Sequence, residues 1–224
     1  MSNDIRNILL IVGEVITCYS FLIILSKKYK TDGIYVYAII ATFISCIMSL
    51  KKISIMNVNI PIGFGTTTSL LIAGNLITQK RGKEEIKTFL ALIFITALLS
   101  CCFLNLTGLM ESSKINEFAN KSYDSIFTYN LRIYLALLIS LIISIWLSSS
   151  LYYLIKRLQN KIVLSNIFSI ILVEVLENLL FILIAYLFEY KALDLVFCII
   201  FRYMIKTIIG LLGTIPIYIA NKNN

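Results

Sequence analysis

The chain has 224 residues, of which 59% are hydrophobic and only nine are glycine and two proline, and its mean hydropathy is +0.90. A soluble domain of this length cannot bury so much apolar surface in one core and still present a polar exterior. The composition therefore excludes an ordinary soluble protein and predicts an integral membrane protein. We assign the net charge of +8 to loops beside the membrane and not to nucleic-acid binding, because no compact basic domain is present.

Continuously apolar segments of about 20 residues, long enough to cross a bilayer as a helix, recur along the chain. Because apolar and polar residues do not alternate in them, these segments exclude a transmembrane β-barrel and predict an all-α, polytopic helical bundle with six to seven spans. No segment is left for a soluble domain, so we expect one transmembrane domain over residues 1–224. The predicted spans are residues 8–26, 33–50, 61–79, 86–108, 131–155, 163–187 and 193–220, of which the second and third have the weakest signal.

Lysine and arginine are concentrated in alternate connections between the predicted spans. The connections after the first, third and fifth spans contain KKYK, KRGKEEIK and KRLQNK, whereas the long connection around Lys114 and Lys121 mixes basic and acidic residues. Because basic connections stay in the cytoplasm, we expect the N-terminus outside and the C-terminus inside. The abundance of Ile, Lys, Asn and Ser is typical of an AT-rich genome, which indicates the cytoplasmic membrane of a bacterium.

Several kinds of chemistry are excluded by residues that the chain lacks. Histidine is absent, which rules out imidazole metal sites and histidine-based catalytic triads. The cysteines fall within predicted spans without C-x-x-C spacing, so we interpret them as packing residues. No G-x-x-x-x-G-K-[ST] motif occurs, and ATP hydrolysis would therefore require a separate subunit. We assign no catalytic residue, no metal ion and no cofactor.

Two acids interrupt the apolar sixth span, ILVEVLENLLFILIAYL. Glu174, Glu177 and the adjacent Asn178 project from one face of a helix. In the last span, Arg202 and Lys206 are four residues apart and also share a face. If these spans form an antiparallel hairpin that turns near residue 190, Glu174 lies level with Lys206. The same register places Asn178 level with Arg202, so that acids and bases meet at mid-membrane depth.

Charges in the bilayer centre cost several kcal/mol and usually pair or line a pathway. The four charges are therefore either a structural pin between two helices or part of a ligand site. One pair is enough for a pin, and the presence of two pairs and an amide favours the ligand site. Glu14 in the first span is a further acid. Two interpretations stay open: it is a third acid of the site, or it lies near a water-filled vestibule. The hydroxyls of residues 65–69 and 148–150 are more typical of backbone bonding and close helix packing.

The order of these segments resembles the VUT family, the queuosine precursor transporters, in the form that has an extra N-terminal helix. KTDGIYVY (30–37) resembles that form's K-T-G-L-Y-V-W, and GNLITQKRGKEE (74–85) lies where the family reads T-D-I-L-N-E-K-Y-G-K-K-E. SIILVEVLENLLFILIAY (169–186) resembles S-T-x-x-S-Q-x-x-D-T-x-x-F-x-x-I-A-F. YMIKTIIGLLGTIPIYIANK (203–222) resembles Y-L-L-K-x-x-x-A-x-x-x-T-P-x-x-Y-L-A-K. The resemblance extends over nearly the whole chain and rests on order and spacing.

The departures from the family pattern concern its polar residues. The family's aspartate and glutamate of the third helix are Asn75 and Gln79 here. The family's glutamine and aspartate of the sixth helix are Glu174 and Glu177, and the lysine at Lys206 is retained. The resemblance therefore implies that the two buried acids stand where the family keeps a polar pair for its ligand.

The resemblance implies import of a 7-deazaguanine precursor of queuosine across the membrane. This ligand is a flat ring whose guanine-like edge presents adjacent N–H donors, and one ionised carboxylate can accept both. Tyr203 and Phe201 are candidates for stacking on the ring. The expected substrate-binding residues are Glu174, Glu177, Asn178, Arg202, Lys206 and Asn75.

Other functions stay open at this point. The chain could be the substrate-binding subunit of a vitamin importer of the energy-coupling-factor type, whose partners would include ATPase subunits. It could also be an intramembrane enzyme or a structural membrane subunit. Because the paired aspartate clusters that hold Mg²⁺ in intramembrane transferases are absent, we expect no enzymatic activity. The substrate and the lipid bilayer are the expected partners in every transport hypothesis.

Overall fold

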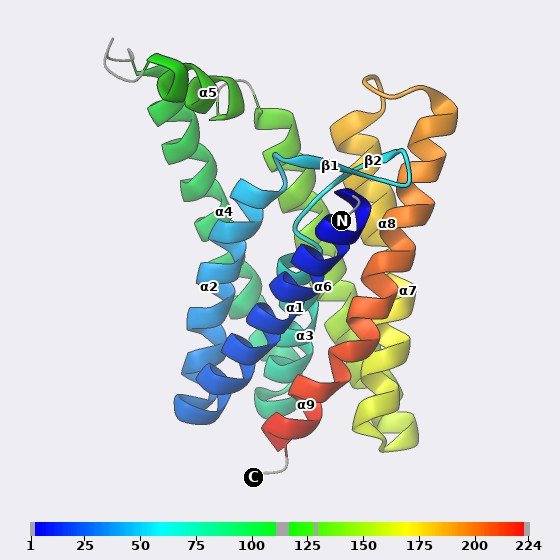
Figure 1. Ribbon diagram of the computed structural model, residues 1–224. Coiled ribbons are helices and arrows are strands. Elements are labelled where there is room, and N and C mark those ends of the chain that lie inside the picture. The colour runs from blue at the N-terminus through cyan, green and yellow to red at the C-terminus, as the bar shows by residue number, and fades with distance from the viewer. Residues whose placement is uncertain (1–2, 111–116, 128–129, 222–224) are drawn as a thin grey trace.

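The computed structural model describes residues 3–110, 117–127 and 130–221, and these residues are almost entirely helical (Figure 1). The predicted all-α, polytopic bundle is thereby confirmed. Among the described residues, six segments are long and apolar enough to cross a membrane. They are α1 (Asn3–Lys28), α2 (Lys30–Met48), the short turn Lys83–Glu85 with α4 (Ile86–Leu109), α6 (Leu131–Gln159), α7 (Ile162–Tyr186), and Ala192–Ala220.

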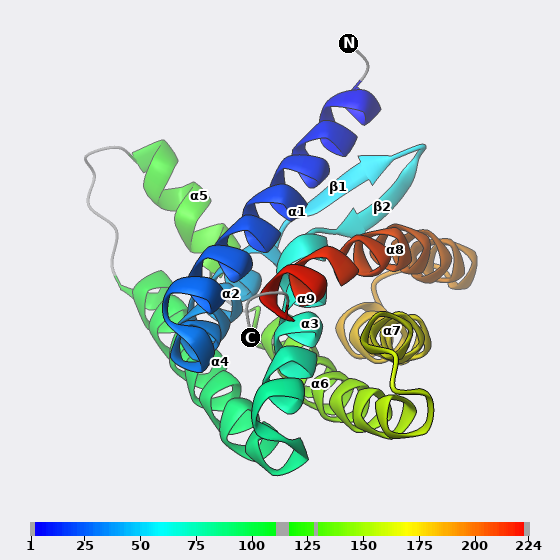
Figure 2. The same cartoon turned by 90° about the horizontal axis from the view of Figure 1, so that it is seen from below.

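Helix α3 (Phe64–Arg81) is the central helix of the bundle, and Figure 2 shows it enclosed by its neighbours. All of its residues from Phe64 to Thr78 are buried. Its two glycines, four threonines and other small or polar residues give it a lower hydropathy than a lipid-facing span has. This composition is tolerated because protein surrounds the helix. At Gly74 a Cβ atom would lie 2.9 Å from Ile145 of α6, so glycine permits the close packing. The third predicted span therefore corresponds to a core helix.

The last predicted span consists of two helices, α8 (Ala192–Leu212) and α9 (Thr214–Asn221). Pro216 lacks an N–H donor, and its ring conflicts with the carbonyl group four residues earlier, which belongs to Leu212. This conflict explains why α8 ends there. Gly213 at the junction packs against α3, where a Cβ atom would come within 2.0 Å of the Ile72 side chain.

A β-hairpin occupies the connection between α2 and α3. Strands β1 (Lys52–Ile55) and β2 (Val58–Pro61) pair antiparallel. The turn residues Met56 and Asn57 both have positive φ, 49° and 65°, as a two-residue type I′ turn requires. Ile60 is buried and fixes the hairpin to the bundle. Hydropathy analysis does not detect strands of four residues, because they are much shorter than a spanning window.

The two ends of the bundle differ in charge. Figure 1 places the hairpin, the α7–α8 connection and α5 (Glu117–Phe127) at one end, and α9 at the other. The last turns of α1, α3 and α6 lie at the α9 end, and each carries two basic residues. Lys114, in the connection predicted to be external, lies outside the described residues. The side of the membrane that each end faces stays a prediction.

We expect cysteine labelling to place the hairpin end outside the cell. In a background in which the five native cysteines are replaced by alanine, Asn57→Cys should react with a membrane-impermeant maleimide in intact cells. Lys156→Cys, at the basic end, should react only after lysis. The reverse pattern would invert the orientation.

Candidate functional site

Four charged side chains meet inside the bundle, between α7 and α8. Glu174, Glu177, Arg202 and Lys206 are each at most 1% exposed. The Lys206 Nζ atom lies 2.6 Å from Glu177 Oε2 and 2.7 Å from Glu174 Oε2. Arg202 directs Nη1 and Nη2 at the two carboxylate oxygens of Glu177, each at 3.5 Å. We call these four residues the charged cluster; it is neutral overall, and Lys206 bridges its two acids.

The geometry agrees with the helical hairpin that the sequence predicts. The expected pairing of Glu174 with Lys206 is confirmed by their contact. Arg202, expected level with Asn178, contacts Glu177 one residue earlier. Asn178 is buried next to the cluster and donates its amide N–H to the backbone carbonyl of Glu174 at 2.7 Å. In the part of the chain that the structure describes, no three metal-ligating side chains gather into a metal site.

Helix α3 adds a hydroxyl group to the charged cluster. Thr68 Oγ1 donates to Glu174 Oε1 at 2.7 Å. The sequence predicted backbone bonding for this run of hydroxyls, and the prediction holds for Thr66 and Thr67, which both donate to the carbonyl of Gly63. Thr68 instead donates to a side chain, and it packs closely against α8 at Gly210. The contact with Glu174 joins residues 106 positions apart, and no local sequence pattern encodes that register.

Close packing of α8 keeps Lys206 within reach of both acids. Gly210 follows Lys206 by one helical turn on the same face of α8. A Cβ atom at Gly210 would lie 2.5 Å from Ile170 of α7 and 3.8 Å from Thr68 of α3. Small residues at such positions let helix backbones approach each other in membranes. Glycine at this position therefore allows α8 to lie against both α7 and α3.

Two buried polar atoms at the charged cluster have no hydrogen-bond partner. They are Oδ1 of Asn178 and Nε of Arg202, whereas Oε2 of Glu174 is held by the Lys206 ammonium at 2.7 Å. Buried polar groups are nearly always hydrogen-bonded in native proteins. Unpaired donors and acceptors side by side are therefore positions where a bound molecule can form bonds.

An aromatic ring also contacts the charged cluster. The Arg202 guanidinium lies 4.4 Å from the centroid of the buried Phe181 ring. Phe181 follows Glu177 by one helical turn, and this spacing was the signal that could have found it. Of the two rings predicted to stack on a ligand, Phe201 instead lines an apolar cleft of about 310 Å³ between α1, α8 and the hairpin. Tyr203 is partly exposed on α8.

Asn75 belongs to a second polar layer that carries no charge. Its Nδ2 atom donates to Asn166 Oδ1 at 2.9 Å and lies 3.2 Å from Ser169 Oγ. Its Oδ1 atom accepts a hydrogen bond from Ser148 of α6 at 3.1 Å. Asn75 follows Thr68 by two helical turns, or roughly 10 Å along α3. The structure thus does not bring Asn75 into contact with the charged cluster.

Three polar side chains lie along one face of α3. Thr68 contacts the charged cluster, Asn75 contacts the uncharged layer, and Gln79 accepts a hydrogen bond from the Tyr152 hydroxyl at 2.8 Å. Residues with these spacings share a helix face. The three side chains run from the charged cluster towards the basic end of the bundle.

Glu14 has a different position, at the start of α3. Its Oε1 atom accepts backbone N–H groups of Gly65 at 2.8 Å and Thr66 at 3.1 Å. The first N–H groups of a helix have no partner within the helix, and a carboxylate there also complements the helix dipole. A Cβ atom at Gly65 would lie 3.2 Å from the Glu14 side chain, so glycine permits this approach. In this structure Glu14 caps α3 from α1.

Comparison with known proteins supports the resemblance read from the sequence. Residues 61–220 match a family described as "Putative vitamin uptake transporter". Searches of curated proteins and of solved structures returned no match. The matched region covers well over half of the chain and includes α3 and every later helix, and hence both polar layers. The chain therefore belongs to the vitamin uptake transporter family.

Proposed function

We propose that this multi-pass membrane protein imports a 7-deazaguanine precursor of queuosine across the cytoplasmic membrane of a bacterium. Membership in the family supports uptake of a vitamin or a related precursor. The sequence resemblance favours the deazaguanine within that class. The proposal rests chiefly on one observation, the buried charged cluster with unpaired donor and acceptor atoms beside it. We propose no enzymatic step and no cofactor.

The groups at the charged cluster match the hydrogen-bonding edge of such a ring. A carboxylate of Glu177 can accept two adjacent N–H donors, and the edge also carries a carbonyl acceptor. The unpaired Nε of Arg202 can donate to that carbonyl group, and the unpaired Oδ1 of Asn178 can accept a further N–H. Phe181, which already contacts Arg202, supplies an apolar face for the ring.

The ion pairs of the charged cluster suit a site that must be stable when empty. An uncompensated charge in the bilayer interior is costly, so the acids need partners before the ligand arrives. Lys206 contacts both acids and can release Glu177 while it keeps Glu174. We therefore propose that binding exchanges one ion pair for hydrogen bonds to the ligand.

Growth of a suitable bacterial strain tests this proposal. A strain that neither makes nor imports deazaguanine, supplied with trace precursor, should regain queuosine in its tRNA when it expresses the chain. Expression alone and expression with energy-coupling-factor ATPase subunits separate a self-sufficient importer from a substrate-binding subunit. No queuosine under either condition would contradict the proposed substrate.

The proposed function predicts that Glu177→Gln impairs uptake more than folding. Glutamine retains the volume and some hydrogen bonding but loses the ionised acceptor, which is worth roughly 1.5–3 kcal/mol for a charged hydrogen bond. We expect uptake per folded molecule to fall by about tenfold or more. The control is Glu189→Gln, which removes a half-exposed acid paired with Lys52 at the hairpin end. A structural pin predicts the opposite result, loss of folded protein with unchanged uptake per molecule.

A further inference from the structure

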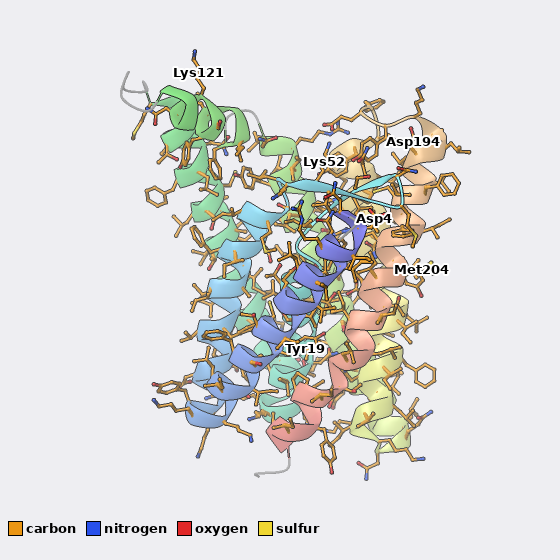
Figure 3. All side chains as sticks on the ribbon, in the orientation of Figure 1. Asp4, Tyr19, Lys52, Lys121, Asp194 and Met204 are labelled. Carbon is orange, nitrogen blue, oxygen red and sulfur yellow. The ribbon has the colours of Figure 1, made fainter. Side chains whose placement is uncertain are left out.

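A small cavity opens at the hairpin end of the bundle, away from the charged cluster. Its volume is about 180 Å³. Pockets for drug-sized ligands have volumes of about 300–1,000 Å³, so this cavity suits a smaller molecule such as one flat heterocycle. Figure 3 shows Asp194 at this end of α8, beside the hairpin. The cavity is lined by Asn57, Val58, Asn59, Tyr190, Asp194 and Phe197.

The lining contains a carboxylate, amides and aromatic rings, the kinds of group that we propose bind the ligand at the charged cluster, but no basic residue. Asp194 supplies an exposed carboxylate, and Asn57 and Asn59 supply amides that donate and accept hydrogen bonds. Tyr190 and Phe197 supply aromatic rings. The Tyr190 hydroxyl also donates to the backbone carbonyl of Asn59 at 3.4 Å, which joins strand β2 to the α7–α8 connection.

Aromatic side chains connect this cavity with the charged cluster. The Tyr190 ring stacks on Tyr186, with their centroids 5.3 Å apart, and Tyr186 meets Phe181 edge to face at 6.1 Å. Phe181 in turn contacts Arg202 of the cluster at 4.4 Å. Tyr190 lies in the turn after α7, Tyr186 at the end of α7 and Phe181 further along α7 towards the middle of the bundle. The three rings therefore form a continuous line of contacts from the cavity to the charged cluster, and Tyr186 and Phe181 are fully buried within it.

We propose that this cavity is an outer pocket, which captures a flat heterocycle with two adjacent N–H donors before the molecule passes to the charged cluster. Asp194 accepts the two donors, as one carboxylate can. Asn57 and Asn59 bond to the remaining polar edge, and Tyr190 and Phe197 contact the ring. The inference rests on the proposed function, because it gives the outer pocket the same class of substrate as the charged cluster.

Equilibrium dialysis of the full-length protein in detergent tests the outer pocket, with 7-deazaguanine as the probe. The wild-type protein should bind two equivalents. Asp194→Asn should lose one of them, and Glu177→Gln should weaken the other. 7-Deazaadenine, whose edge places an acceptor beside a donor, should bind to neither site.

Uptake kinetics give a second readout of the outer pocket. Asp194→Asn should raise the apparent KM on the order of tenfold, as expected for one lost charge-assisted hydrogen bond, and leave the maximal rate unchanged. The matched control is Asp32→Asn, which removes an exposed acid at the opposite end whose carboxylate lies 3.9 Å from Arg81. This control should change neither binding nor KM.

The possible failures can be told apart. Suppose that the wild-type protein takes up the ligand and binds one equivalent, and that Asp194→Asn has an unchanged KM. This result would overturn the outer pocket and leave the proposed function intact. One bound equivalent that depends on Asp194 but not on Glu177, without uptake, would support the pocket and overturn the proposed function. Neither binding nor uptake would overturn both.

Discussion

Replacing Lys206 by methionine is expected to lower the yield of folded protein severalfold and to abolish uptake. Lys206 contacts Glu174 at 2.7 Å and Glu177 at 2.6 Å, and its loss leaves Arg202 alone with two buried acids. Removal of one partner from a buried ion pair costs about 3–5 kcal/mol. This is a large share of a typical folding stability of about 5–15 kcal/mol.

A second substitution should reverse much of this loss. Lys206→Met with Glu174→Gln keeps the contact between Glu177 and Arg202, so one acid remains with one base. The matched control, Lys206→Met with Glu177→Gln, has the same net charge but leaves Glu174 with Thr68 and without the base that contacted it. We expect the first double variant to recover more folded protein than the second, and neither to transport.

Size-exclusion chromatography of detergent-extracted protein gives the folded yield for all variants. Equal yields of the two double variants would show that Arg202 is not specifically coupled to Glu177. If the losses from Lys206→Met and Glu174→Gln add up in the first double variant, the two residues do not interact, and the ligand site must be sought away from the interface of α7 and α8.

Hydropathy predicts the lipid-facing helices of this protein well, because each must be apolar enough to face lipid on its own. Its signal is weakest where protein replaces lipid, as in the third predicted span. Helix α3 is buried from Phe64 to Thr78 and tolerates threonine and asparagine, so its composition resembles neither a lipid-facing span nor a loop. The break at Gly213 has a local cause in Pro216, and attention to that proline would have predicted it.

The charged cluster was predictable for a geometric reason. Residues Glu174 and Lys206 lie on consecutive antiparallel helices, and the short connection between them fixes their relative height. Thr68 and Glu14 were not assigned to their partners, because their contacts depend on how α3 packs against α7 and α1, which are not its neighbours in sequence. Asn75 lies apart from the charged cluster because α3 packs against α7 in a register that brings Asn75 to Asn166. No local sequence pattern indicates this register.

Glu14→Ala is expected to remove most of the folded protein, whereas Glu14→Gln should keep most of both yield and uptake. Alanine leaves the backbone N–H groups of Gly65 and Thr66 without their acceptor at the start of a buried helix. An unsatisfied buried donor costs about 1–3 kcal/mol, and a membrane interior offers no water in its place. Glutamine retains a carbonyl oxygen for both donors and loses only the charge at the helix terminus, which is worth about 0.3–2 kcal/mol.

The pair of variants also decides whether Glu14 acts only as a cap. If Glu14 carries a proton or binds the ligand, Glu14→Gln will fold normally and fail to transport, because glutamine cannot ionise. If Glu14 is a cap, uptake per folded molecule will stay near that of the wild-type protein. Asp4→Asn, in the first turn of the same helix, controls for loss of an acid from α1 without loss of the cap. Uptake and folded yield measured on the three variants separate the two roles, since only the cap makes alanine far more damaging to folding than glutamine.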